Sequence, residues 1–318
     1  MHYDVFNGDA DGIIALLQLR LAEPKSSTLI TGVKRDIQLL DKVPAQAGDT
    51  VTALDISMEK NLPALEALLA RNVSVFYADH HKSGVIPQSD QLQAHIDLDA
   101  NTCTALIIDQ LLAGKYHTWA ITAAYGDNLI AKADQLADAI GLNAEQKAQL
   151  KELGTLINYN GYGEVTDDLH FDPAVLFNEF LAYDDPFAVI ADRDSPYSLL
   201  KNAYQQDMQQ AIATEAKYQS AVVGVFELPN QAASRRISGV YGNWLANQSP
   251  DSAHVVLTEN SNGTYTVSLR APLNNKQGAG DICGQFISGG GRAAAAGINA
   301  LPKDELAKLI EAIEQYYT

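Results

Sequence analysis

The chain has 318 residues, and 22 lysines and arginines stand against 39 aspartates and glutamates, which gives a formal net charge of −17. Hydrophobic residues make up 47% of it, so the chain can bury a core and is not disordered, and its length favours two medium domains over one large domain. So acidic a protein lacks the broad basic surface that binding a long nucleic acid requires.

Membrane and secretory segments are not expected. The apolar runs are too short to span a bilayer, and the N-terminus lacks the basic and then apolar pattern of a secretory signal. Cys103 and Cys283 are too few for a disulfide framework or a cysteine-based zinc site. We therefore expect a cytoplasmic protein with reduced thiols.

Short apolar runs alternate with helical patterns in the first half of the chain. Strands are expected at 3–6, 28–33, 50–54 and 73–78, and helices at 13–21, 62–70, 104–112 and 119–124. Repeated strand-then-helix units predict a mostly parallel sheet with helices on both faces.

The second half changes in character. Residues 144–181 have a helical pattern, and the polar segment 197–220 reads as a helical connector. Strands are expected at 222–228, 253–257 and 265–269, and an amphipathic helix at 304–316. The sequence therefore predicts an α/β protein: an N-terminal domain, 1–190, whose mostly parallel sheet is flanked by helices, a helical linker, 191–220, and a smaller mixed α/β domain, 221–318.

Acidic and imidazole side chains follow three of the expected strands. Asp9 and Asp11 follow the first strand, Asp55 follows the strand at 50–54, and Asp79-His80-His81 ends the strand at 73–78. Asp127 follows a helix end rich in small residues. The carboxyl ends of the strands line the ligand crevice in open α/β sheets, so these side chains converge if the strands are neighbours.

A crevice with so many carboxylates needs cations, because the carboxylates otherwise repel one another. Carboxylate and imidazole ligands together suit manganese, iron or zinc better than calcium. Two ions about 3.5–4 Å apart would need a bridging carboxylate and would clamp an in-line phosphoryl displacement. Taken one at a time, these residues can be explained without a metal. Asp9 and Asp11 form an Asp-x-Asp pattern that is common in turns, and Asp55 could cap the N-terminus of a helix.

In this combination the chain resembles the DHH phosphoesterase superfamily, whose name matches the triplet Asp79–His81. Three further segments carry the likeness: residues 6–12 (FNGDADG), 54–55 (LD) and 125–128 (YGDN). Residues 267–270 and 288–297 are similar to the DHH-associated substrate domain.

The resemblance implies two manganese ions and assigns roles by position. Asp9 would bind the first ion, Asp11, His80 and Asp127 the second, and Asp55 would bridge them. His81 would stand beside the scissile phosphate, so the catalytic residues are His81, Asp55 and His80. Asp79 would orient a histidine from behind.

Two positions depart from the family pattern. Val5 stands where many relatives have histidine, four residues before Asp9, and Asn7 would supply an oxygen or hold a water instead. Arg292 follows the glycines where relatives commonly have histidine.

The glycine-rich segment and two arginines are the expected substrate contacts. Gly289, Gly290 and Gly291 allow close approach of a phosphate, a following helix N-terminus would favour an anion, and Arg292 and Arg270 would add positive charge. Alternatively, the glycines bind no ligand and only form a tight turn before a buried helix. Lys34 and Arg35 follow the second strand and could reach the phosphate crevice, but a solvated strand end is the expected interpretation.

The sequence thus predicts an enzyme: a manganese-dependent phosphodiesterase that hydrolyses short linear nucleotides, such as pGpG or other nano-RNA, to mononucleotides through a water activated by two metals. Such a hydrolase would act in nucleotide signalling or RNA degradation. The alternatives are a cyclic-dinucleotide phosphodiesterase, a 3′,5′-bisphosphonucleotide phosphatase, a single-strand exonuclease and a non-catalytic nucleotide sensor. The expected partner is a short nucleotide, with no long nucleic acid and no membrane, and a homodimer is allowed.

Overall fold

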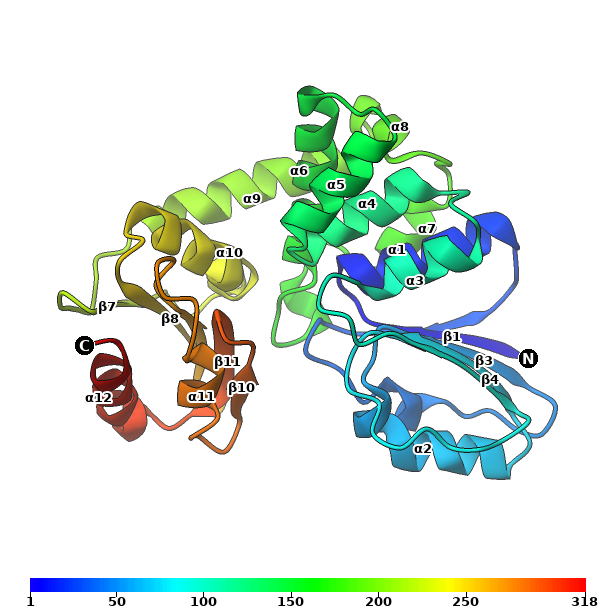
Figure 1. The fold of residues 1–318 in the computed structure, drawn as a ribbon, viewed down its shortest axis with the longest axis horizontal. Coiled ribbons are helices and arrows are strands. Elements are labelled where there is room, and N and C mark those ends of the chain that lie inside the picture. Colours follow the sequence, from blue (N-terminus) through cyan, green and yellow to red (C-terminus); the bar gives the residue numbers. More distant parts are fainter. The chain divides into compact units, whose positions relative to one another are not determined.

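The computed structural model describes residues 1–318 and divides into two compact units, Met1–Asn202 and Ala203–Thr318. We call these the N-terminal unit and the C-terminal unit. The polar connector expected from the sequence contains helix α9 (Pro196–Ile212), which runs across the division (Figure 1). No helix has both the length and the apolar character needed to cross a membrane.

The N-terminal unit is built on a five-stranded sheet in which every pair of neighbours is parallel, in the order β2-β1-β3-β4-β5. Its strands are β1 (His2–Phe6), β2 (Thr28–Ile30), β3 (Thr50–Leu54), β4 (Ser74–Asp79) and β5 (Leu92–Ile96). The central strands are largely buried on both faces, as is usual in a parallel sheet covered by helices. The expected parallel sheet is confirmed, with β5 as an edge strand that was not expected.

Helices cover both faces of this sheet, with α2 on one face and α1 and α3 on the other (Figure 1). The helices of the unit are α1 (Ala10–Ala22), α2 (Met58–Ala70), α3 (Thr104–Leu111), α4 (His117–Gly126), α5 (Ile130–Ala139), α6 (Ala144–Asn160), α7 (Pro173–Phe180) and α8 (Pro186–Ala191). Short 3₁₀ turns occur at Leu39–Lys42 and Thr166–Asp168. The core beneath α2 includes Val51, Val75 and Leu65.

Small residues let α1, α4 and α6 approach one another closely. A Cβ added to Gly126, the last residue of α4, would lie 2.5 Å from Cβ of Ala10 in α1 and 2.8 Å from the carbonyl oxygen of Gly154 in α6. Carbon atoms in ordinary contact are about 3.5–4.0 Å apart, so no larger side chain fits. The contact holds the start of α1, with Asp11, against the end of α4, with Asp127.

The C-terminal unit contains a six-stranded mixed sheet in the order β10-β11-β9-β8-β7-β6. Its strands are β6 (Tyr218–Gln219), β7 (Val223–Glu227), β8 (Ala253–Glu259), β9 (Tyr265–Arg270), β10 (Gly289–Gly291) and β11 (Ala295–Leu301), and only β7 and β8 pair in parallel. Helix α10 (Ala232–Gln248) covers one face, and α11 (Ala279–Cys283) and α12 (Leu306–Tyr317) cover the other (Figure 1). A 3₁₀ turn at Lys303–Glu305 precedes α12.

The helix expected after the glycine-rich segment is wrong, because Gly289–Gly291 and Ala295–Leu301 form an antiparallel hairpin. A Cβ on Gly289 would lie 1.9 Å from the carbonyl oxygen of Cys283 in α11. Gly291 has a φ of 146°, and its Cβ would lie 2.5 Å from Cα of Ala296. Close packing against α11 and within the hairpin therefore overrides the helix preference of the alanines.

Candidate metal centre

The carboxyl ends of β1, β3 and β4 lie side by side, because these strands are consecutive in the sheet. The assumption that the three strands are neighbours is therefore confirmed. The segment 7–11 leaves β1, Asp55 directly follows β3, and Asp79 ends β4 and leads into His80 and His81. Asp9, Asp11, Asp55 and Asp79 are all buried at this edge.

Asp55, His80 and His81 each place one potential ligand atom within 4.8 Å of the others. Nε2 of His80 lies 3.5 Å from Oδ1 of Asp55, and Nδ1 of His81 lies 3.8 Å from the same oxygen. Nε2 of His80 is also 3.8 Å from Oδ2 of Asp11. The backbone of Asp55 has a φ of 57°, a conformation that aspartate tolerates better than most residues, and its N–H donates to the Ala78 carbonyl at 3.1 Å.

Asp79 holds the ring of His81. Oδ1 of Asp79, which is fully buried, lies 2.8 Å from Nδ1 of His81, whose side chain is 46% exposed. Burial lowers the pKa of His81, but the hydrogen bond to Asp79 and its negative charge outweigh that effect, so the pKa lies above its ordinary value. Asp79 thus orients the ring of His81 through the Nδ1 atom.

Asp9 and Asp11 also organise the backbone around the cluster. Oδ1 of Asp9 accepts the N–H groups of Asp11 at 3.0 Å and Gly12 at 3.1 Å, so Asp9 caps α1. The two oxygens of Asp11 accept the N–H groups of Thr104 at 2.7 Å and Ala105 at 2.8 Å at the start of α3. The same carboxylates therefore join β1, α1 and α3.

Negative charges accumulate at this edge of the sheet. Burial raises the pKa of Asp55 well above its usual value, and the charges of Asp11 and Asp9 raise it further. Asp127, directly after α4, belongs to the same group: burial raises its pKa, Lys34 opposes the shift, and Asp11 and Asp9 add to it. The five residues expected to bind metal, Asp9, Asp11, Asp55, His80 and Asp127, are therefore brought together in one corner.

Lys34 lies in this corner as well, and the solvated strand end expected for it is wrong. Its Nζ donates to Oδ2 of Asp9 at 2.5 Å and to Oδ1 of Asn158 at 2.9 Å, and its side chain is 28% exposed. Burial raises the pKa of Asp9, but attraction to Lys34 outweighs it and lowers that pKa to about 2. The available signal was position: Lys34 follows β2, whose carboxyl end lies at the same edge as that of β1.

The side chain of Asn7 is engaged by two backbone groups, and the neighbouring Val5 offers no ligand atom. Oδ1 of Asn7 accepts the N–H of Asp9 at 3.2 Å, and its Nδ2 donates to the carbonyl of Lys34 at 3.1 Å. Asn7 thus ties the loop after β1 to the segment after β2. Val5 is fully buried in β1 and has no donor atom.

Arg270, at the end of β9, is held within the C-terminal unit. Its Nε donates to Oδ1 of Asn243 at 2.6 Å, its Nη1 to Oγ of Ser268 at 3.0 Å and its Nη2 to the carbonyl of Gly239 at 3.0 Å. The guanidinium group is therefore fixed in orientation against α10.

Arg292 stands at the turn of the β10–β11 hairpin. The residue is exposed, and its N–H donates to the Ala295 carbonyl at 2.9 Å. At the neighbouring Gly290, an added Cβ would meet nothing within 4 Å, whereas Gly289 and Gly291 are required by packing. Only Gly290 of the three glycines thus faces open space.

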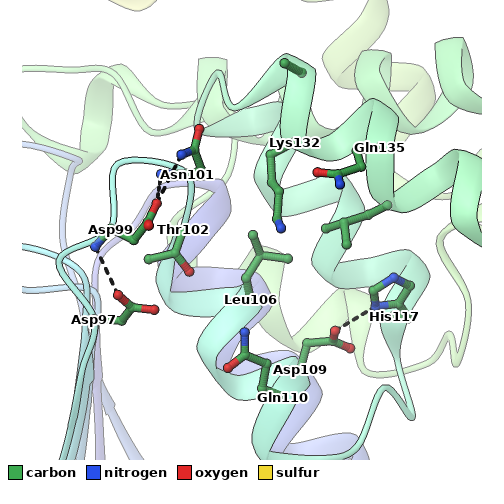
Figure 2. Close-up of a pocket in the computed structure, with 12 residues that line it drawn as sticks. Asp97, Asp99, Asn101, Thr102, Leu106, Asp109, Gln110, His117, Lys132 and Gln135 are labelled. Carbon is green, nitrogen blue, oxygen red and sulfur yellow. Dashed lines mark hydrogen bonds and ion pairs between the residues drawn. The ribbon is translucent and has the colours of Figure 1, made fainter.

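The N-terminal unit also has a separate pocket of about 690 Å³ that shares no residue with the carboxylate cluster. It lies between the segment before α3, α3 itself and α5 (Figure 2). Its polar lining includes Asp99, Lys132 and the pair formed by Asp109 and His117, 2.6 Å apart. His117 therefore has a carboxylate partner away from the candidate metal centre.

The donor set of the cluster fits a divalent metal ion. Carboxylate oxygens and imidazole nitrogens together suit the first-row transition metals, and Asp55, His80 and His81 offer both within one small volume. Burial and the neighbouring carboxylates raise the pKa of Asp55 and of Asp127, and a bound cation would offset this accumulation of negative charge.

Comparison with known families gives a match within the C-terminal unit. A family profile of the DHHA1 domain matches residues 216–318, which begin just before β6. No curated protein sequence matches the chain.

Solved structures share the fold over nearly the whole chain. The exonuclease RecJ bound to manganese is 14% identical, with a TM-score of 0.58, over 99% of this chain and 89% of that chain. The pGpG-specific phosphodiesterase PggH from Vibrio cholerae is 12% identical, with a TM-score of 0.53, over 100% and 99%. An exopolyphosphatase-related protein from Bacteroides fragilis is 14% identical, with a TM-score of 0.51, over 99% and 92%. At these identities the likeness is one of fold.

Proposed function

We propose that this chain is a member of the DHH phosphoesterase superfamily and a metal-dependent phosphodiesterase that hydrolyses short linear nucleotides, such as pGpG or other nano-RNA, to mononucleotides. One observation carries the proposal. The buried carboxylates that follow β1 and β3, and the half-buried carboxylate that follows α4, meet the two imidazoles that follow β4 in one corner of the N-terminal unit.

The residues that would hold metal are Asp9, Asp11, Asp55, His80 and Asp127. Manganese is the ion we propose these residues to hold. A divalent ion bound there would supply Lewis acidity, which would activate a water and stabilise negative charge on the phosphoryl oxygens. The oxygens of Asp9 and Asp11 are already oriented by the backbone N–H groups that they accept.

His81 is the residue we propose to serve the leaving group. Hydrolysis forms a bond from water oxygen to phosphorus and breaks the bond from phosphorus to O3′, which then needs a proton. Asp79 engages Nδ1 of His81, so Nε2 is the atom that would donate this proton, and the raised pKa of His81 favours the protonated ring. Its half-exposed side chain allows contact with a substrate.

The C-terminal unit would bind the rest of the substrate. We propose that Arg292 and Gly290, exposed at one hairpin turn, contact a phosphate, and that Arg270 adds positive charge in a fixed orientation. The net charge of −17 disfavours long nucleic acids and is consistent with a short substrate. The fold is shared with a pGpG-specific phosphodiesterase and with the exonuclease RecJ, which is compatible with either short or longer linear substrates.

The proposal is tested by initial rates with manganese on a substrate panel: pGpG and other linear dinucleotides, trinucleotides, cyclic dinucleotides, 3′,5′-bisphosphonucleotides and single-stranded DNA. We expect linear dinucleotides to be cleaved fastest and to give two mononucleotides. Preference for another substrate identifies the corresponding alternative enzyme. Tight nucleotide binding without turnover indicates a sensor, and hydrolysis of no substrate refutes the proposal.

Two matched variants connect any activity to this site. His81→Ala should abolish most of the turnover, whereas His95→Ala, which removes an imidazole that contacts Gln93 and the ring of Phe76, should not. Equal activity in both variants would place the reaction elsewhere.

A further inference from the structure

One carboxylate of the cluster already has a cation from its own chain. Oδ2 of Asp9 accepts a hydrogen bond from the ammonium group of Lys34 at 2.5 Å, and Oδ1 accepts the two N–H groups that cap α1. Both oxygens of Asp9, a residue only 4% exposed, are therefore engaged.

Lys34 is held in this position by more than its attraction to Asp9. Its backbone N–H donates to the carbonyl of Gly161 at 2.8 Å, and its own carbonyl accepts from Asn7 at 3.1 Å. The ammonium group also donates to Oδ1 of Asn158 at 2.9 Å and lies 5.6 Å from the centre of the Tyr162 ring. The segment that ends α6 is thus built to direct Lys34 at the carboxylate cluster.

Asp55 has different surroundings. Its Oδ1 accepts a hydrogen bond from the hydroxyl of Thr104 at 3.2 Å and faces the two imidazoles of His80 and His81. Neutral imidazole nitrogens are metal ligands, whereas an ammonium group can only compete with a metal for a carboxylate. The corner therefore has one side suited to a divalent ion, at Asp55, and one side with a fixed ammonium, at Asp9.

We propose that the ammonium group of Lys34 takes the place of one of the two divalent ions, so that the chain binds a single ion, at Asp55 and His80. The inference depends on the proposed function only in requiring that this cluster binds metal. It replaces the two-ion arrangement implied by the family resemblance, and it removes Asp9 from the residues proposed above to hold metal. Positive charge is then present beside Asp9 at any metal concentration, so activity should rise with metal through one binding step.

The experiment counts ions directly. Manganese is titrated into the full chain while the free ion is measured by electron paramagnetic resonance, which requires no substrate and no turnover. We expect one ion per chain for the wild type and for Lys34→Arg, which retains the charge. Lys34→Met should bind a second ion, because Oδ2 of Asp9 is released.

Lys147→Met is the matched control. It makes the same change of charge and removes a lysine from an ion pair of similar length, 2.7 Å to Asp138, but on the surface of α6. It should bind one ion, with unchanged affinity.

The outcomes separate the two proposals. Two ions of similar affinity in the wild type, or a single ion in Lys34→Met, would overturn the role of Lys34 and leave the phosphodiesterase proposal intact. No ion bound by the wild type would overturn both. If Lys34→Met fails to fold, the counts for the wild type and Lys34→Arg decide the question.

Discussion

Replacing Gly126 with alanine should destabilise the N-terminal unit and weaken metal binding together. The added methyl carbon would lie 2.5 Å from Cβ of Ala10 and 2.8 Å from the carbonyl oxygen of Gly154. Neither neighbour can move aside by rotating a side chain, since one is a methyl group and the other is backbone. The end of α4, and with it Asp127, must therefore shift away from α1.

The size of the effect follows from two opposing contributions. Alanine in place of glycine within a helix stabilises it by at most about 1 kcal/mol. Overpacking of a tight contact costs about 1–3 kcal/mol. We expect a net loss of about 1–2 kcal/mol, which lowers the melting temperature of a unit of this size by about 2–8 °C.

The assay uses the two tryptophans, because one lies in each unit. Trp119 is fully buried in α4. Replacing Trp244 of α10 with phenylalanine leaves the fluorescence of Trp119 as the only tryptophan signal during urea unfolding. The control is Gly242→Ala in α10, whose added Cβ would come no closer than 3.4 Å to Arg270. Unchanged or increased stability of Gly126→Ala would refute the close approach of α1, α4 and α6.

Three further predictions concern single side chains. Asp79→Asn removes the charge behind His81 and should lower kcat on a linear dinucleotide by about 10–100-fold with the fold retained; an unchanged kcat contradicts the orienting role. Asp4→Ala removes the carboxylate that the buried guanidinium group of Arg20 contacts at 2.6 and 2.8 Å. The free energy of unfolding in urea should fall by about 3–5 kcal/mol, whereas a change near zero would mean that the pair is not desolvated. His254 is 3% exposed, and its burial lowers its pKa from 6.5 to about 4, so the unfolded chain takes up the proton first. Stability of the C-terminal unit should be full above pH 6.5 and fall by about 3 kcal/mol as the pH drops towards 4, and His254→Leu should remove most of this dependence in unfolding midpoints at pH 4.5 and 7.5.

The sequence was sufficient to locate the cluster, because its residues lie at strand ends. Asp55 and Asp79 follow short apolar runs, and parallel strands bring such positions to one edge of a sheet. The position of Lys34 could not be predicted, because its contacts depend on Asn158 and Gly161, which are more than 120 residues away in the chain. No local sequence pattern indicates that these residues come close to Lys34.

The missed elements have similar causes. The edge strand β5 alternates strictly between apolar and polar residues over Leu92–Ile96, so the sequence carried a strand signal there, but only over five residues. Helix α10 buries Ile237, Tyr241 and Leu245 at a helical spacing, but its glycines weaken the local preference for a helix. The β10–β11 hairpin is rich in glycine and alanine, whose conformation is decided by the packing around them.

The central claim is that the side chains at the carboxyl ends of β1, β3 and β4 form a metal centre. An anomalous difference map from crystals grown with manganese tests this claim most directly. The account predicts a manganese peak at bonding distance from Asp55 and His80 that disappears in Asp55→Asn crystals, where asparagine tolerates the same backbone conformation. A map with no peak at these residues, or with manganese bound only elsewhere, would contradict it.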